Sequence, residues 1–101
     1  MPSRRDRPNV LLLYTDQQRF DALGYTGNRH IRTPHLDALA ATGGCFSHAY
    51  CNSPVCMPSR QSMLSGQYPS ALGTTTNGIE MREETLTLQR VLKPYGYTTA
   101  N

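Results

Sequence analysis

Val10-Leu11-Leu12-Leu13-Tyr14 is an uninterrupted apolar run, and it decides the predicted fold. A run of this kind is typical of a β-strand that is covered on both faces in a parallel sheet. Thr33 is a good N-cap and Pro34 a good first helical residue, so the sequence predicts a helix that Gly43 ends. Residues 45–50 alternate as expected of a second strand. A strand, a helix and a second strand in this order imply a parallel crossover, so the predicted fold class is α/β.

The rest of the chain is predicted to be helical and looped. A helix over residues 58–64 should end at Gly66, and a polar loop should follow over residues 67–84. Thr87 is expected to cap a last short helix, which Pro94 should end early because proline disfavours helical geometry in the residue before it.

Composition limits the classes of function. The net charge of the 101 residues is +3, and part of it lies in a basic N-terminal arm, residues 1–7. No basic repeat follows the arm, which predicts a solvated tail and no nucleic-acid partner. No apolar run is long enough to cross a membrane or to form a signal-peptide core. We therefore expect a cytoplasmic protein without a membrane partner.

Cys56-Met57-Pro58-Ser59-Arg60 carries the strongest chemical signal. Three cysteines are an odd number, which leaves at least one thiol free for chemistry. Cys56 directly precedes a proline suited to the first helical position, where free amides and the positive end of the helix dipole favour an anion. Arg60, one turn further on, adds a cation that can hold two oxygens at once. Asp16 and Cys56 both follow predicted strands, so we expect them to share one crevice.

The pattern C-x-P-x-R, with Leu64-Ser65-Gly66 in register, resembles the signature of the type I sulfatases. The resemblance covers most of residues 8–100, and the stretch over residues 96–100 is similar to the start of a second sulfatase signature. Asp16-Gln17 is similar to the choline-sulfatase and phosphonate monoester hydrolase branch of the superfamily. The resemblance implies an alkaline-phosphatase-like parallel-sheet sandwich with helices on both faces, of which residues 8–101 would be a truncated N-terminal portion.

The resemblance also implies a cofactor chemistry. Cys56 would be oxidised to formylglycine by a modifying system, and its hydrated aldehyde would offer one hydroxyl to attack sulfur and another whose deprotonation expels sulfate. A divalent metal, Ca²⁺ or Mg²⁺ or Mn²⁺, would be held by Asp16, Gln17 and the modified Cys56, since carboxylate and amide oxygens are hard ligands. Arg60 would stabilise charge in the transition state. Asn77 would contact the substrate, although an ordinary turn at Asn77-Gly78 explains it nearly as well.

Other side chains are weaker candidates. The spacing of Cys45, His48, Cys51 and Cys56 invites a zinc site but matches none of the usual structural patterns. His30 and His35 are expected to be exposed polar residues. Arg19 and Asp21 follow Asp16 closely enough to orient it, yet a local surface ion pair accounts for them equally well.

The sequence therefore predicts a sulfuric ester hydrolase acting on a small-molecule sulfate ester, with the fragment alone inactive. A phosphonate monoester or phosphodiester hydrolase on the same scaffold is the nearest alternative. A truncated remnant without activity, or a small binding module, is the alternative of another class, since the family's Gly-Lys and His after residues 96–100 are missing.

Overall fold

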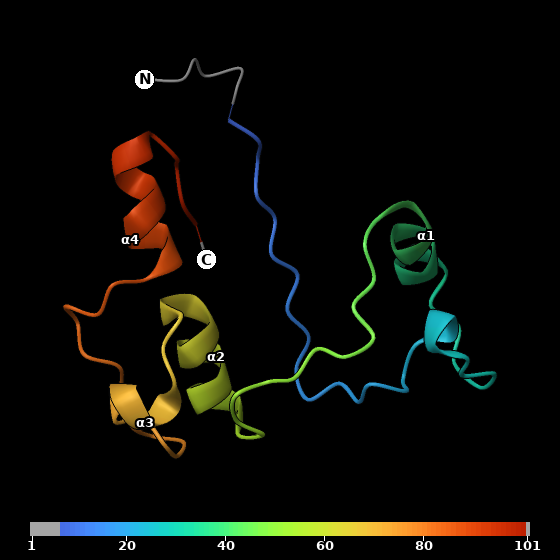
Figure 1. Cartoon of the computed structure of the whole chain (residues 1–101), viewed down its shortest axis with the longest axis horizontal. Helices are drawn as coiled ribbons and strands as arrows, with labels where there is room; N and C mark the ends of the chain where they lie inside the picture. The colour runs from blue at the N-terminus through green and yellow to red at the C-terminus, as the bar shows by residue number, and fades with distance from the viewer. Residues whose placement is uncertain (1–6, 101) are drawn as a thin grey trace. The chain divides into compact units, whose positions relative to one another are not determined.

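A computed structural model of the chain describes residues 7–100 (Figure 1). The chain divides into two units, Met1–Gly43 and Gly44–Asn101. The regular structure of the described residues is helical, and no strand is formed among residues 7–100. Most of the predicted basic arm falls outside the described residues, and the α/β class stays a prediction.

The first unit contains the 3₁₀ turn η2, Gly24–Thr26, and the helix α1, Pro34–Thr42. The predicted helix after Thr33 is confirmed, with Pro34 at its first position and Gly43 at its end. The Thr33 hydroxyl, however, does not cap α1. It accepts a hydrogen bond from the Gly24 N–H and donates one to Asp37 Oδ1, both 2.8 Å long. Thr33 therefore fastens η2 to the start of α1.

The apolar run over residues 10–14 is exposed rather than covered. Leu11 is 82% exposed and Leu13 68% exposed, and no strand is assigned to this segment. A strand needs the backbone groups of a neighbour to form its ladder, and a single hydrophobic segment cannot supply them. The prediction that residues 10–14 are a strand in a sheet is not realised in this structure, because no paired neighbour is present among residues 7–100.

The segment over residues 45–50, predicted as a second strand, contains a turn instead. The turn lies at Ser47 and His48, where the serine hydroxyl is 2.9 Å from His48 Nδ1. Phe46 and Tyr50 are both 85% exposed. Alternation alone predicted this strand, and alternation does not provide the partner that a strand requires.

The second unit contains α2, Cys56–Ser65, α3, Pro69–Leu72, α4, Leu88–Leu92, and the 3₁₀ turn η3, Lys93–Tyr95 (Figure 1). Gly66 ends α2 with φ +69°, as predicted. Thr87 caps α4 by accepting a hydrogen bond from the Arg90 N–H, also as predicted. The predicted loop over residues 67–84 was wrong in part, because it contains α3.

Packing in the described residues is thin. No large hydrophobic side chain among residues 7–100 is buried, and the fully buried side chains there are Thr74 and Pro58. None of the helices that the structure describes has the length and apolar composition that crossing a bilayer requires.

Candidate active site

Cys56 is the first residue of α2, and it is exposed. The sequence placed Pro58 at the first helical position, and this was wrong: α2 begins two residues earlier, so Pro58 is its third residue. Proline is tolerated there because the first N–H groups of a helix have no partner within it. The shift puts the Cys56 side chain on the helix itself.

Asn77 lies against this helix start, as part of a turn twenty-one residues after Cys56. Its side-chain oxygen Oδ1 is 3.3 Å from Cys56 Sγ and 3.1 Å from the Met57 backbone nitrogen. The thiol and the amide N–H both donate to that oxygen. The structure thus brings together two of the residues that the sequence singled out, twenty-one positions apart in the second unit.

Further contacts fasten the same loop to α2. The Gln61 side-chain amide donates to the Ile79 carbonyl over 3.0 Å, and the Gly78 N–H donates to Met57 Sδ over 3.4 Å. Sequence reasoning did not predict these contacts. The polar character of residues 61 and 77 was visible, but their pairing across the loop was not.

A second polar contact holds the segment that precedes Cys56. The Asn52 side-chain amide donates to Ser62 Oγ over 2.9 Å, and Ser62 is only 3% exposed. Since Asn52 lies before Cys56 and Ser62 after it, this bond closes a loop around the cysteine. No motif in the sequence pointed to this pair.

Arg60 lies on α2 and is exposed. Residues four apart on a helix share a face, so Arg60 and Cys56 lie on the same side of α2. A guanidinium one turn from an exposed helix start can approach a small anion held there.

Asp16 and Gln17 lie in the first unit, whereas Cys56, Arg60 and Asn77 lie in the second. Both Asp16 and Gln17 are exposed, in a bend that follows the extended segment. Gln17 has φ +46°, a left-handed conformation that is rare for a residue with a side chain. The donor set, one carboxylate and one amide oxygen, fits part of the shell of a hard divalent cation. That Asp16 shares a crevice with Cys56 remains a prediction.

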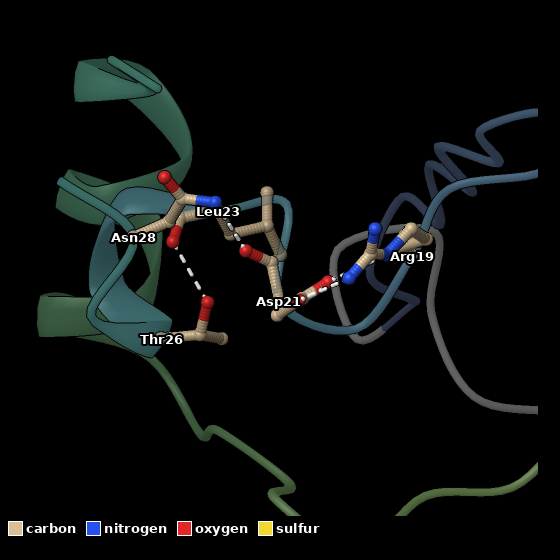
Figure 2. A network of polar contacts seen from close by, with 5 residues as sticks. All are labelled: Arg19, Asp21, Leu23, Thr26 and Asn28. Carbon is tan, nitrogen blue, oxygen red and sulfur yellow. Dashed lines mark hydrogen bonds and ion pairs between the residues drawn. The ribbon is translucent and has the colours of Figure 1, made fainter. Parts of the chain in front are cut away.

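Arg19 and Asp21 form the surface ion pair that the sequence allowed (Figure 2). Two of the three Arg19 side-chain nitrogens, Nε and Nη2, contact the Asp21 carboxylate at 2.9 and 2.6 Å, and the two side chains are 80% and 58% exposed. The Asn28 amide donates to the Asp21 carbonyl over 2.7 Å and the Thr26 hydroxyl to the Leu23 carbonyl, also over 2.7 Å. The network ties the segment after Gln17 to η2.

The zinc alternative receives no structural support. Among residues 7–100 no three histidine, cysteine, aspartate or glutamate side chains gather in an arrangement that could hold a metal ion. Cys45 and Cys51 are free and exposed, as are His30 and His35.

Cys56 thus lies exposed at a helix start, with Arg60 on the same face and the turn at Asn77 beside it. Comparisons with known proteins show the family to which these residues belong. The sulfatase family profile matches residues 8–101. The chain belongs to the sulfatase family.

Individual relatives support the same family. An ulvan-active sulfatase of Formosa agariphila is 43% identical over 94 residues, which cover 93% of this chain and 18% of that protein. A steryl-sulfatase of Mus musculus is 36% identical over 104 residues, 92% of this chain and 17% of that protein. An N-acetylgalactosamine-6-sulfatase of Sus scrofa is 43% identical over 72 residues, 70% of this chain and 14% of that protein. No solved protein structure matches the chain significantly. The chain spans less than a fifth of the length of these relatives.

Proposed function

We propose that this chain is part of a hydrolase that cleaves sulfate esters, with formylglycine formed from Cys56 as the nucleophile. The observation that carries the proposal is the position of Cys56, exposed at the first residue of α2 in a chain of the sulfatase family. The relatives are named for sulfated substrates of different kinds, including ulvan and steroids. Their common chemistry is the sulfate ester.

In this proposal Cys56 provides the nucleophile, and Arg60 and Asn77 bind the anion. If Cys56 is converted and the aldehyde hydrated, one hydroxyl would attack sulfur while the S–O bond to the substrate alcohol breaks. Loss of the proton of the other hydroxyl would then expel sulfate and regenerate the aldehyde. Arg60 would bind the sulfate oxygens through its fork of N–H donors and stabilise the charge that grows on them. Asn77 would donate from its amide nitrogen to the same anion, because its oxygen is already occupied by Cys56 and Met57.

Asp16 and Gln17 would hold part of the shell of a divalent metal. The chemistry of their oxygens fits Ca²⁺, Mg²⁺ or Mn²⁺ better than a soft metal. A bound cation supplies polarisation of the ester oxygens. The charge of Asp16 is what would make it the stronger of the two ligands.

A phosphonate monoester or phosphodiester hydrolase is the second candidate, and one observation favours it. Gln17 follows Asp16 directly, where many sulfatases carry a second acidic residue. Sulfate and phosphoryl esters present similar tetrahedral oxyanions, so the site described would accept either.

A chimera tests the proposal. Residues 8–101 would replace the matching segment of the ulvan-active sulfatase, expressed with a system that modifies C-x-P-x-R cysteines. We expect hydrolysis of an aryl sulfate that is lost in Cys56→Ala and strongly reduced in Arg60→Ala. Hydrolysis of an aryl phosphonate monoester in preference to the sulfate would support the second candidate. Turnover that survives Cys56→Ala would contradict both.

A further inference from the structure

The start of α2 has no cap from its own sequence. Its N-cap residue is Val55, whose apolar side chain makes no capping hydrogen bond. The four N-terminal N–H groups of a helix have no partner within it, and a side-chain oxygen normally satisfies one of them. Ser59 N–H donates to the Val55 carbonyl over 3.0 Å, and Pro58 has no N–H. The Met57 N–H therefore needs an acceptor from elsewhere.

Asn77 provides that acceptor from twenty residues away. Its Oδ1 lies 3.1 Å from the Met57 nitrogen and 3.3 Å from Cys56 Sγ, so one oxygen holds both the backbone and the side chain of the helix start. Asparagine is among the best capping residues when it is local. Here the capping oxygen comes instead from a residue in a loop that is distant in the sequence.

The loop is itself held in place on both sides of Asn77. The Thr76 hydroxyl donates to the Asn77 carbonyl over 3.3 Å, and Gly78 has φ +86°, a conformation that favours glycine. One residue further, the Ile79 carbonyl accepts from Gln61 on the next turn of α2. Residues 77–79 therefore each contact α2, through Cys56, Met57 or Gln61.

We propose that Asn77 is a positioning residue, which caps α2 from outside and fixes the orientation of the side chain at position 56. An oxygen that accepts from S–H can equally accept from the O–H of a converted residue, so the same bond would hold the nucleophile in place. This last step rests on the proposed function. The capping itself does not.

The contact also orients Asn77. With Oδ1 directed at the helix start, the amide nitrogen of the same group is directed away from Met57 and is available to donate to an anion. Positioning and substrate binding are thus separable roles of the two ends of one side chain. Asn77→Asp keeps the acceptor and loses the donor, whereas Asn77→Ala loses both.

Amide hydrogen exchange of the ¹⁵N-labelled 101-residue chain, followed by NMR, tests the capping without any activity. In Asn77→Ala we expect the Met57 amide to exchange about fivefold faster or more, the effect of losing one hydrogen bond of ordinary strength. In Asn77→Asp the Met57 rate should stay within about twofold of the original, because aspartate and asparagine are equivalent caps. Asn28→Ala is the matched control: it removes an asparagine from a hydrogen-bonded loop in the first unit and should leave Met57 unchanged.

The Gly66 amide, which donates to the Ser62 carbonyl over 2.8 Å at the other end of α2, is the internal reference. The exchange rate of the Gly66 amide should stay the same in Asn77→Ala while that of the Met57 amide rises. The proposal is overturned if Asn77→Ala leaves Met57 unchanged, if Gly66 accelerates equally, or if the Met57 amide has no protection in the original chain.

Turnover of the chimera then tests what the positioning does. Asn77→Ala should lower kcat, and Asn77→Asp should recover much of that kcat while raising KM, because a carboxylate repels the anionic substrate. An unchanged kcat in Asn77→Ala would contradict the positioning role. If the chimera has no activity at all, the proposed function fails while the exchange experiment still decides the capping.

Discussion

Cys56 and Met57 offer fewer free amides to an anion than the start of a helix usually does. Pro58 has no N–H, and the Met57 N–H is already bound to Asn77. An oxyanion at this end of α2 would depend on the guanidinium of Arg60 and on the Asn77 amide nitrogen more than on backbone donors. Charged donors form hydrogen bonds roughly twice as strong as neutral ones, so Arg60 would carry the larger share of the binding.

Asp16→Asn in the chimera should abolish most turnover, and part of the activity should return at high Mg²⁺ or Ca²⁺. The amide keeps an oxygen donor but loses the charge, so the cation binds more weakly and mass action can compensate. Rates measured across a metal titration check this. Cys56→Ala is the control that no metal concentration should restore. A rescue of Cys56→Ala by metal, or a metal-insensitive loss in Asp16→Asn, would remove Asp16 from the metal shell.

The helices were the predictable part of the structure because their signals are local. Pro34, Gly66 and Thr87 each act on the backbone within one turn, and all three were placed correctly, although the Thr33 hydroxyl does not cap α1 as predicted. α3 was missed because four residues between Tyr68 and Gly73 carry almost no periodicity. Val10 to Tyr14 is the opposite case, since a strand is defined by a neighbour that its own sequence does not describe.

In the candidate site, too, some features had a signal in the sequence and others had none. The family resemblance implied that Asn77 contacts the substrate, which stays a prediction, whereas its contact with Cys56 is seen only in the structure. The Asn52–Ser62 pair had no signal, because a serine in a helix and an asparagine in a loop are ordinary in isolation. Only the tertiary arrangement shows that Ser62 is buried and bonded.

Ser62→Ala should loosen the loop that leads into α2. It leaves the Asn52 amide without its acceptor, and the loss of such a bond costs about 1 kcal/mol. Amide exchange of Ser53, Val55 and Cys56 should accelerate accordingly. Ser65→Ala is the matched control in the same helix, because the Ser65 hydroxyl makes only local contacts at the C-terminal end of α2. It donates to the Gln61 carbonyl over 2.7 Å and accepts from the Gln67 N–H over 3.3 Å. Equal effects of the two substitutions would show that Ser62 has no special part in holding the loop.

The chain as a whole leaves much apolar surface exposed, including residues 10–14, and buries no large hydrophobic side chain among residues 7–100. Folding is driven mainly by such burial, so the described residues supply little of the rigidity that catalysis needs. The relatives are more than five times as long as the segment matched here.

We therefore expect the 101-residue chain by itself not to hydrolyse sulfate or phosphonate esters at a useful rate, even with Cys56 converted. Misplacing a catalytic group by about 1 Å can already cost on the order of 100-fold. Purified chain assayed with an aryl sulfate and added metal, beside the chimera at equal concentration, provides the comparison. Robust metal-dependent turnover by the chain alone would show that these residues suffice for a complete site.

Mass spectrometry of Cys56, after expression with a system that modifies C-x-P-x-R cysteines, tests directly whether this residue becomes formylglycine. Trypsin releases residues 33–60 as one peptide containing Cys45, Cys51 and Cys56, so fragment ions must assign the change and the other two cysteines serve as internal controls. We expect conversion of Cys56 to formylglycine, with Cys45 and Cys51 unchanged. An unmodified Cys56 in cells that convert a control sulfatase would contradict it.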